Sequence, residues 1–185
     1  MNKLLIGLVC TVSILACNNK KLDSTKAYFS VVDYLNSEVK KTDSLPVHFL
    51  KITAVDSTSD TTTSTREEFN RYAKEFLTIP DIASLRNMKH YTEANEFDEA
   101  MNTVLLMYTP KEDDDVVRNE TIMMEPDETG NTHVKTILVT TVQANEDSTV
   151  EKNLTWHIDK RFQVVTKTSK NGQRENISTV IITWE

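Results

Sequence analysis

The sequence predicts one α+β domain, in which N-terminal helices pack on a curved antiparallel sheet of about six or seven strands. Three observations favour this fold class. The chain has 185 residues, of which 38% are apolar and 26% charged, enough for one sizeable core and too few for two ordinary domains. Apolar residues recur at helical spacing in the first half of the chain, and the period changes to two from about residue 91. No helical pattern separates the later runs, which is typical of an antiparallel meander.

The first seventeen residues have the layout of an export signal. Lys3 precedes an uncharged, mostly apolar run at 4–16, and polar residues follow at once. Spanning a bilayer takes roughly 20 apolar residues, so this run is too short for a transmembrane helix. We therefore expect residues 1–16 to be a cleaved signal peptide, residues 17–23 a polar tether and residues 24–185 a single domain.

The segment Ile14-Leu15-Ala16-Cys17 resembles the lipobox of bacterial lipoproteins, in which an aliphatic residue, a tolerant position and a small residue precede a modified cysteine. Leu15 is bulkier than the usual alanine or serine at its position. The resemblance implies that Cys17 carries diacylglycerol on its sulfur and a fatty acid such as palmitate on its amino group. Two or more acyl chains hold a protein stably on a membrane, whereas one binds only marginally. The alternative is an ordinary cleaved signal with an incidental cysteine.

The lipobox implies a cell-envelope protein that is anchored to a membrane and faces the periplasm or the cell surface. Asn18 follows the modified cysteine where an acidic residue would retain some lipoproteins at the inner membrane, which favours the outer membrane. Both cysteines, Cys10 and Cys17, lie in or at the end of the signal, so disulfides and cysteine chemistry are excluded from the mature chain. A net charge of −7 argues against a nucleic-acid partner.

Two amphipathic helices are predicted ahead of the sheet. Ser24 is the expected cap of the first helix. Its apolar stripe is formed by Tyr28, Val31, Val32, Leu35 and Val39. Thr65 and Glu68 fit a capping box at the start of the second helix. Its apolar positions are Phe69, Tyr72, Ala73, Phe76 and Leu77. A further short helix with Ile82, Leu85 and Met88 is expected after Pro80.

Strands account for most of the remaining chain. Residues 47–55 are rich in strand-forming residues, and residues 56–64 are predicted to form a polar loop that contributes nothing to a core. The later strands are expected at residues 104–108, 116–124, 134–142, 150–158, 162–168 and 177–184.

The last hairpin predicts which side chains reach the core. Asn171-Gly172 fits a two-residue type I′ turn, which sets Phe162 opposite Ile181 and Val164 opposite Thr179 on the core face. The opposite, outer face of the last strand then carries Val180, Ile182 and Trp184.

Two earlier hairpins agree with this core face. A three-residue loop at 159–161 sets Trp156 opposite Val164, whereas a two-residue loop would point Trp156 to the wrong face. Across the loop at 145–148, Ile137 is expected opposite Trp156.

The sequence contains no motif that predicts catalysis, a metal or a cofactor. The histidines lack zinc-ligand spacing, and the acidic run at 112–115 lacks the ligand pattern of a calcium-binding loop. No Gly-x-Ser-x-Gly segment is present. We therefore expect no catalytic residue, no metal site and no cofactor.

The predicted function is non-enzymatic binding at the envelope, either of a small apolar ligand or of an envelope protein. The expected binding residues are Val180, Ile182 and Trp184 on the outer face. One alternative is an envelope hydrolase with a cavity lined by two or more of His48, His90, His133, Glu93 and Glu96. Another alternative is a structural assembly subunit with a large flat apolar patch and no pocket.

Overall fold

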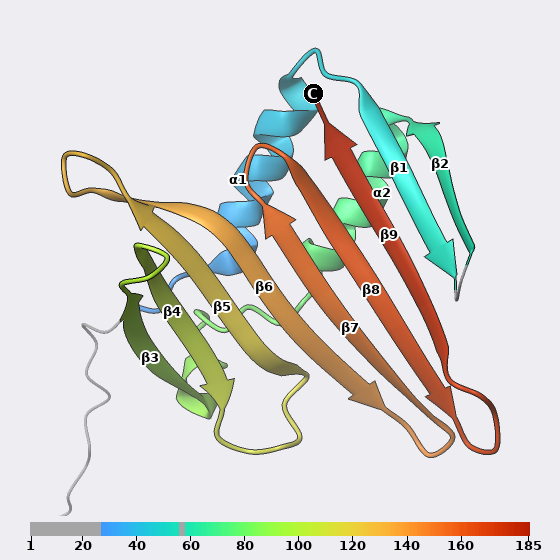
Figure 1. Cartoon of the computed structure of the whole chain (residues 1–185). Coiled ribbons are helices and arrows are strands. Elements are labelled where there is room, and N and C mark those ends of the chain that lie inside the picture. The colour runs from blue at the N-terminus through green and yellow to red at the C-terminus, as the bar shows by residue number, and fades with distance from the viewer. Residues whose placement is uncertain (1–26, 56–57) are drawn as a thin grey trace, which may run out of the picture.

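The computed structural model describes residues 27–55 and 58–185. The predicted signal peptide, Cys17 and Ser24 lie outside the described residues. The predicted α+β class is confirmed: one open sheet of nine antiparallel strands has the order β2-β1-β9-β8-β7-β6-β5-β4-β3 (Figure 1). The sheet is larger than predicted because residues 58–64 and 91–98 also form strands. The strands are β1 Phe49–Val55, β2 Thr58–Ser64, β3 Tyr91–Asp98, β4 Thr103–Pro110, β5 Val117–Pro126, β6 Thr132–Ala144, β7 Ser148–His157, β8 Arg161–Lys170 and β9 Asn176–Trp184.

The first helix, α1, runs over Val31–Ser44 and starts later than predicted. The hydroxyl of Ser30 caps it by accepting a hydrogen bond from the backbone N–H of Asp33 at 3.1 Å. Tyr28 was expected in the helix, but it lies ahead of it in an irregular segment and packs elsewhere.

The second helix, α2, covers Arg66–Leu77, and its predicted capping box between Thr65 and Glu68 is confirmed. The short helix expected after Pro80 is wrong: turns fill this stretch, followed by one 3-10 turn, η1, at Met88–His90. Neither α1 nor α2 is long and apolar enough to cross a bilayer.

The polar loop predicted at 56–64 is wrong from residue 58 onward. Residues 58–64 form β2, which pairs antiparallel with β1 at the edge of the sheet. Threonine favours extended backbone, so a threonine-rich segment can pair even though its side chains are almost all exposed.

The predicted register of the last hairpin is wrong by one residue. Phe162 pairs with Ile182 rather than with Ile181, and Val164 pairs with Val180. The type I′ turn fails because only Gly172 has a positive φ, of 72°, and the strands are separated by residues 171–175. Because the loop has an odd number of residues instead of two, every side chain of β9 points to the face opposite the predicted one. Val180, Ile182 and Trp184 therefore face the core and not the outer face.

The two earlier hairpins keep the predicted face. Ile137 lies opposite Trp156, as expected. The β7–β8 loop has three residues, but they are 158–160, so Trp156 pairs with Phe162 rather than with Val164. A shift of two positions leaves every side chain on its face, and Asp159, with φ of 58°, takes the left-handed position of the turn.

Helices α1 and α2 cover the same face of the sheet, and no helix of the described residues lies on the other face (Figure 1). Under the helices, aromatic rings from both layers pack within 4.8 to 6.4 Å of one another between centroids. This aromatic core consists of Phe49, Phe69, Phe76, Trp156, Phe162 and Trp184. The side of the sheet under the helices is therefore filled by side chains.

Candidate functional site

The face of the sheet opposite α1 and α2, which we call the helix-free face, is covered by no helix of the described residues (Figure 1). Its central side chains come from β1, β9, β8, β7 and β6, and they are cross-strand neighbours of one another. They are Leu50, Ile52, Ala54, Ile181, Thr179, Gln163, Val165, Asn153, Thr155, Leu138 and Thr140.

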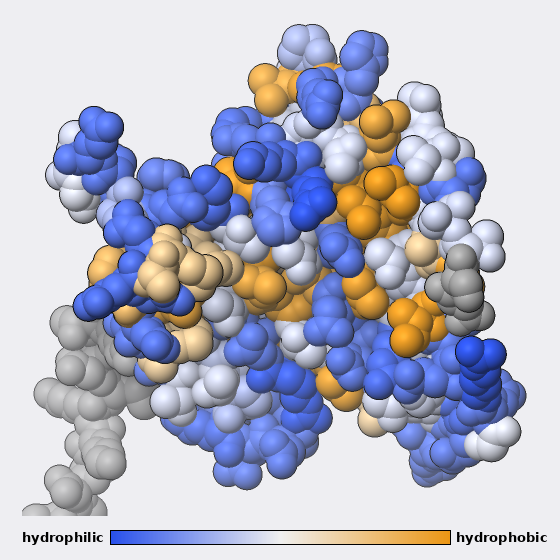
Figure 2. All heavy atoms as spheres, viewed as in Figure 1, coloured by the Kyte–Doolittle hydropathy of each residue, from blue (hydrophilic) through white to orange (hydrophobic). Residues whose placement is uncertain are grey.

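No charged side chain lies in this central set, although 26% of the chain is charged. Charges appear only toward its two ends, with Glu151 beside Lys167 at one end and Arg161 beside His157 at the other. Figure 2, which views this face, shows apolar patches across its middle and hydrophilic residues around them. Leu50 and Ile177 are 47% and 43% exposed, which is high for large aliphatic side chains.

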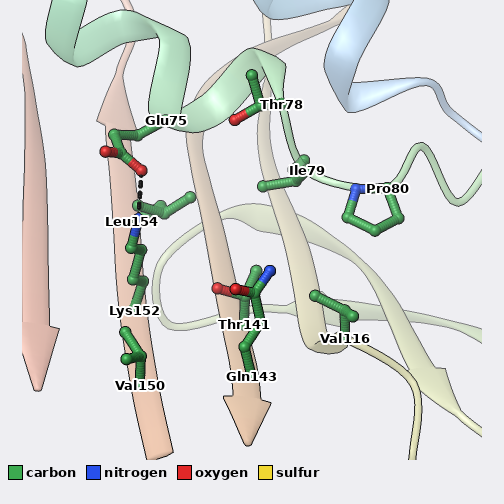
Figure 3. A pocket seen from close by; sticks show the side chains of 10 residues that line it. All are labelled: Glu75, Thr78, Ile79, Pro80, Val116, Thr141, Gln143, Val150, Lys152 and Leu154. Atoms are coloured by element: carbon green, nitrogen blue, oxygen red, sulfur yellow. Dashed lines mark hydrogen bonds and ion pairs between the residues drawn. The ribbon is translucent and has the colours of Figure 1, made fainter. Parts of the chain in front are cut away.

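The hollows of the molecule are poor candidates for a small-ligand site. The most enclosed lies between the end of α2 and strands β6 and β7 and holds about 60 Å³, enough for only a few water molecules. Figure 3 shows Glu75 and Lys152 at one side of this cavity, joined by an ion pair of 2.6 Å. The other hollows among the described residues are more open, hold about 240 to 640 Å³, and are lined mostly by charged and polar residues.

The residues proposed for a hydrolase are not brought together. His48 lies next to β1, His90 ends η1 and His133 lies on β6. Neither these histidines nor Glu93 and Glu96 line any of the hollows described above. Within residues 27–55 and 58–185, no group of three His, Asp or Glu side chains is arranged to hold a metal ion.

The proposed binding residues of β9 lie inside the protein. Ile182 is fully buried and Trp184 is 6% exposed, and both belong to the aromatic side of the core. Val180 is partly buried against the same core. The outward positions of β9 are instead taken by Ile177, Thr179 and Ile181, which the sequence had placed inside.

A second unusual region lies on the helix side, under β3, β4 and β5. The hydroxyl of Tyr108 accepts a hydrogen bond from the backbone N–H of Phe29 at 2.8 Å and donates one to Glu93 at 3.1 Å. Burial is the main cause that raises the pKa of Tyr108 above its ordinary value. Burial likewise raises the pKa of Tyr91 to about 12. We call Tyr91, Glu93, Tyr108 and Glu120 the tyrosine–carboxylate cluster.

Glu120 is the member of this cluster that sequence reasoning missed. It is 1% exposed, lies opposite Tyr108 in the β4–β5 pair, and its Oε1 atom has no hydrogen-bond partner among the described residues. Burial, with a smaller contribution from the nearby Asp81 carboxylate, raises the pKa of Glu120 to about 8. The sequence did contain a signal for its burial. Glu120 is spaced by two and four residues from the apolar Ile122 and Met124 of the same strand, so it lies on their face.

Comparisons with known proteins found no match: no family model matches the chain, and no curated protein or solved structure matches it significantly.

Proposed function

We propose that this chain is a lipid-anchored protein of the cell envelope that binds another envelope protein across the helix-free face. The observation that carries the proposal is the uncharged centre of a sheet face that no helix covers. Interface centres are depleted of charge and surrounded by polar rims, which is the distribution seen here.

The shape of this surface favours a protein over a small molecule. Small-ligand sites are concave, enclose most of the ligand and are lined mainly by apolar side chains. The described hollow that reaches the helix-free face, beside His157 and Arg161, lies at its charged end and is lined mostly by charged and polar residues. Five strands spaced by about 4.8 Å, with about four residues each at about 3.3 Å, span roughly 300 Å². That area is large enough to be the centre of an interface of about 800 Å² per partner.

The lipid anchor would determine where this surface lies relative to the membrane. The lipobox at Ile14-Leu15-Ala16-Cys17 supports attachment through Cys17, and the described chain begins at residue 27 beside β3 and β4. Ten residues reach at most about 35 Å, so the β3–β4 end would stay within that distance of the membrane. The helix-free face would then meet partners that are held on the same membrane.

The anchor is tested by the variant Cys17→Ser in the native host. We expect the chain to move from the membrane fraction to the soluble fraction, and mass spectrometry of the unchanged protein to find an acylated Cys17. An unmodified thiol at Cys17, or a chain that still carries residues 1–16, would overturn this part of the proposal.

The binding surface is tested by photo-cross-linking in the same cells. A benzophenone amino acid at position 181, in the centre of the helix-free face, should give one adduct with a second protein. The same group at position 36, exposed on α1 on the other side of the sheet, is the matched control and should not give it. Introducing a charge with Val165→Lys should reduce the adduct at least tenfold, whereas Asn36→Lys should leave it unchanged.

Three results would contradict a partner protein on this face. They are equal adducts from positions 181 and 36, an adduct that survives Val165→Lys, and an adduct whose mass is twice that of this chain. The last result would assign the face to a second copy.

A further inference from the structure

The tyrosine–carboxylate cluster is closed off from solvent by two irregular segments, which we call the N-terminal cover. They are residues 27–30, directly ahead of α1, and residues 78–87, which connect α2 to η1. Figure 1 shows the second segment passing behind β5 and β6 on the helix side of the sheet. Ile82 in this segment is 1% exposed and belongs to the core.

The two segments of the N-terminal cover contact both the sheet and each other. Tyr28 stacks on Tyr108 with ring centroids 4.8 Å apart, and its hydroxyl donates to the backbone carbonyl of Tyr91 at 3.1 Å. The hydroxyl of Ser30 donates to Asp81 at 3.3 Å, which links the two segments to each other. Segments without regular secondary structure open at lower free energy than packed strands and helices do.

Glu120 lies under this cover, close to a second carboxylate, that of Asp81. The groups that face it are Tyr108 on β4, Val139 on β6 and the Asp81 carboxylate of the cover. Tyr28 in the cover, Tyr91 and Glu93 on β3, and Asp115 and Arg118 around the start of β5 are further titratable groups of the region. Burial and the Asp81 carboxylate both raise the pKa of Glu120, and no positive charge among the described residues offsets them.

A carboxylate in this position is disfavoured relative to the neutral acid. Among the described residues one of its oxygens has no hydrogen-bond partner, and the charged form of a buried group loses its hydration. Moving the cover away would return the carboxylate to water and separate it from Asp81.

We propose that Glu120 is a proton-dependent latch: the neutral side chain keeps the N-terminal cover closed over β3, β4 and β5, and loss of its proton opens the cover. Linkage fixes the direction, because the open form loses the proton at a lower pH than the closed form does. Opening therefore becomes easier as the pH rises from about 4.5 to about 8, and its dependence on pH levels off above this range.

The latch concerns residues other than the lipid anchor and the helix-free face, so it does not rest on the proposed function. Where the chain is anchored at Cys17, release of residues 27–30 would add four residues to the tether. Four residues extend it by about 14 Å.

The test is hydrogen exchange of the full chain, measured by mass spectrometry between pH 5 and 9 and corrected for the intrinsic rate of exchange. We expect the protection of peptides that contain residues 27–30 and 78–87 to fall about tenfold per pH unit between pH 5.5 and 7.5. Peptides from α2 and β7 should keep their protection. In the variant Glu120→Gln, protection of the cover should not depend on pH.

The matched control is Glu125→Gln on the same strand, where Glu125 lies at the surface in an ion pair with Lys135 of 2.9 Å. This variant should retain the pH dependence of the wild type. The variant Asp81→Asn provides a second test that does not alter Glu120: without the like charge, the pH dependence should level off at a lower pH.

Protection of the cover that does not depend on pH in the wild type would overturn the latch. So would an unchanged dependence in Glu120→Gln, or an unchanged plateau in Asp81→Asn. Equal loss of protection in α2, β7 and the cover would also overturn it, because Glu120 would then affect only global unfolding.

Discussion

The two halves of the core are built from different side chains. Under α1 and α2, six aromatic residues of the core pack ring against ring. Phe69 contacts four of the others, which are Phe49, Trp156, Phe162 and Trp184. Under the N-terminal cover, tyrosine hydroxyls and carboxyl groups occupy the corresponding positions of β3, β4 and β5. The first half is stabilised by apolar burial, and the second depends on hydrogen bonds and on the protonation of Glu120.

The aromatic half should show the largest loss of stability on truncation. Phe162 is fully buried and contacts four other rings. We expect Phe162→Ala to lower the free energy of unfolding by about 3–5 kcal/mol in urea titrations. Phe97→Ala, at a position that is 52% exposed, should cost less than about 0.5 kcal/mol. Equal losses from the two variants would show that the aromatic cluster does not dominate stability.

The other half should gain stability when its buried acid is made neutral. Between pH 4.5 and 8 the folded chain holds a proton on Glu120 that the unfolded chain has lost, so wild-type stability falls as the pH rises through this window. Glu120→Gln should therefore raise the free energy of unfolding by about 3 kcal/mol at pH 7. The gain should disappear at pH 4, which urea titrations at the two pH values would check. A variant that is less stable than the wild type at pH 7 would contradict this assignment.

A smaller loss is expected from the tyrosine that joins the cover to the sheet. Tyr108→Phe keeps the ring but removes the hydroxyl that accepts from the Phe29 N–H and donates to Glu93. Removing hydrogen bonds that involve buried groups costs about 1–3 kcal/mol. We expect a loss in this range, together with faster hydrogen exchange at Phe29. Unchanged exchange at Phe29 would show that this hydrogen bond does not hold the cover.

The smallest effect concerns the entry into α2, which carries Phe69 and Phe76 into the aromatic half. Thr65→Ala removes the side-chain acceptor of the Glu68 N–H, at 3.1 Å, and should lower stability by about 1 kcal/mol. Thr63→Ala on the exposed edge strand is the control and should have almost no effect in the same thermal unfolding experiment.

Patterns that repeat over many residues were predictable from the sequence. The α+β class, the capping box at Thr65 and six of the later strands follow from periodicity and local hydrogen bonding. Strand β2 was not predictable in this way, because neither of its faces is buried and its side chains therefore show no alternation.

The register of β9 depended on the φ angle of a single residue. Asn-Gly is typical of a type I′ turn, yet only Gly172 has a positive φ here. Glu175, in the longer loop, contacts Lys167 and Ser169 of β8 at 3.1 and 3.2 Å. Such contacts form only once the strands are paired, so the sequence did not reveal that Trp184 faces the core and Ile181 faces solvent.

The candidate surface was therefore predicted in part. Sequence reasoning placed partner binding on the outer face of the last strands, but it assigned the wrong alternate residues of β9 to that face. Glu120 was overlooked because a lone acidic residue in a strand normally points to water, although its spacing from Ile122 and Met124 places it on the apolar face of β5.

The composition of β2 has a consequence for the behaviour of the chain among crowded neighbours. Its outer edge is open to pairing by a foreign strand, and it contains no proline and only one charged residue, Asp60. A strand added there would gain main-chain hydrogen bonds but would find only short hydroxyl-bearing side chains and Asp60 to pack against. Stable fibrillar stacking needs dry, interdigitated side chains, so this edge resists aggregation because it offers too little to bury.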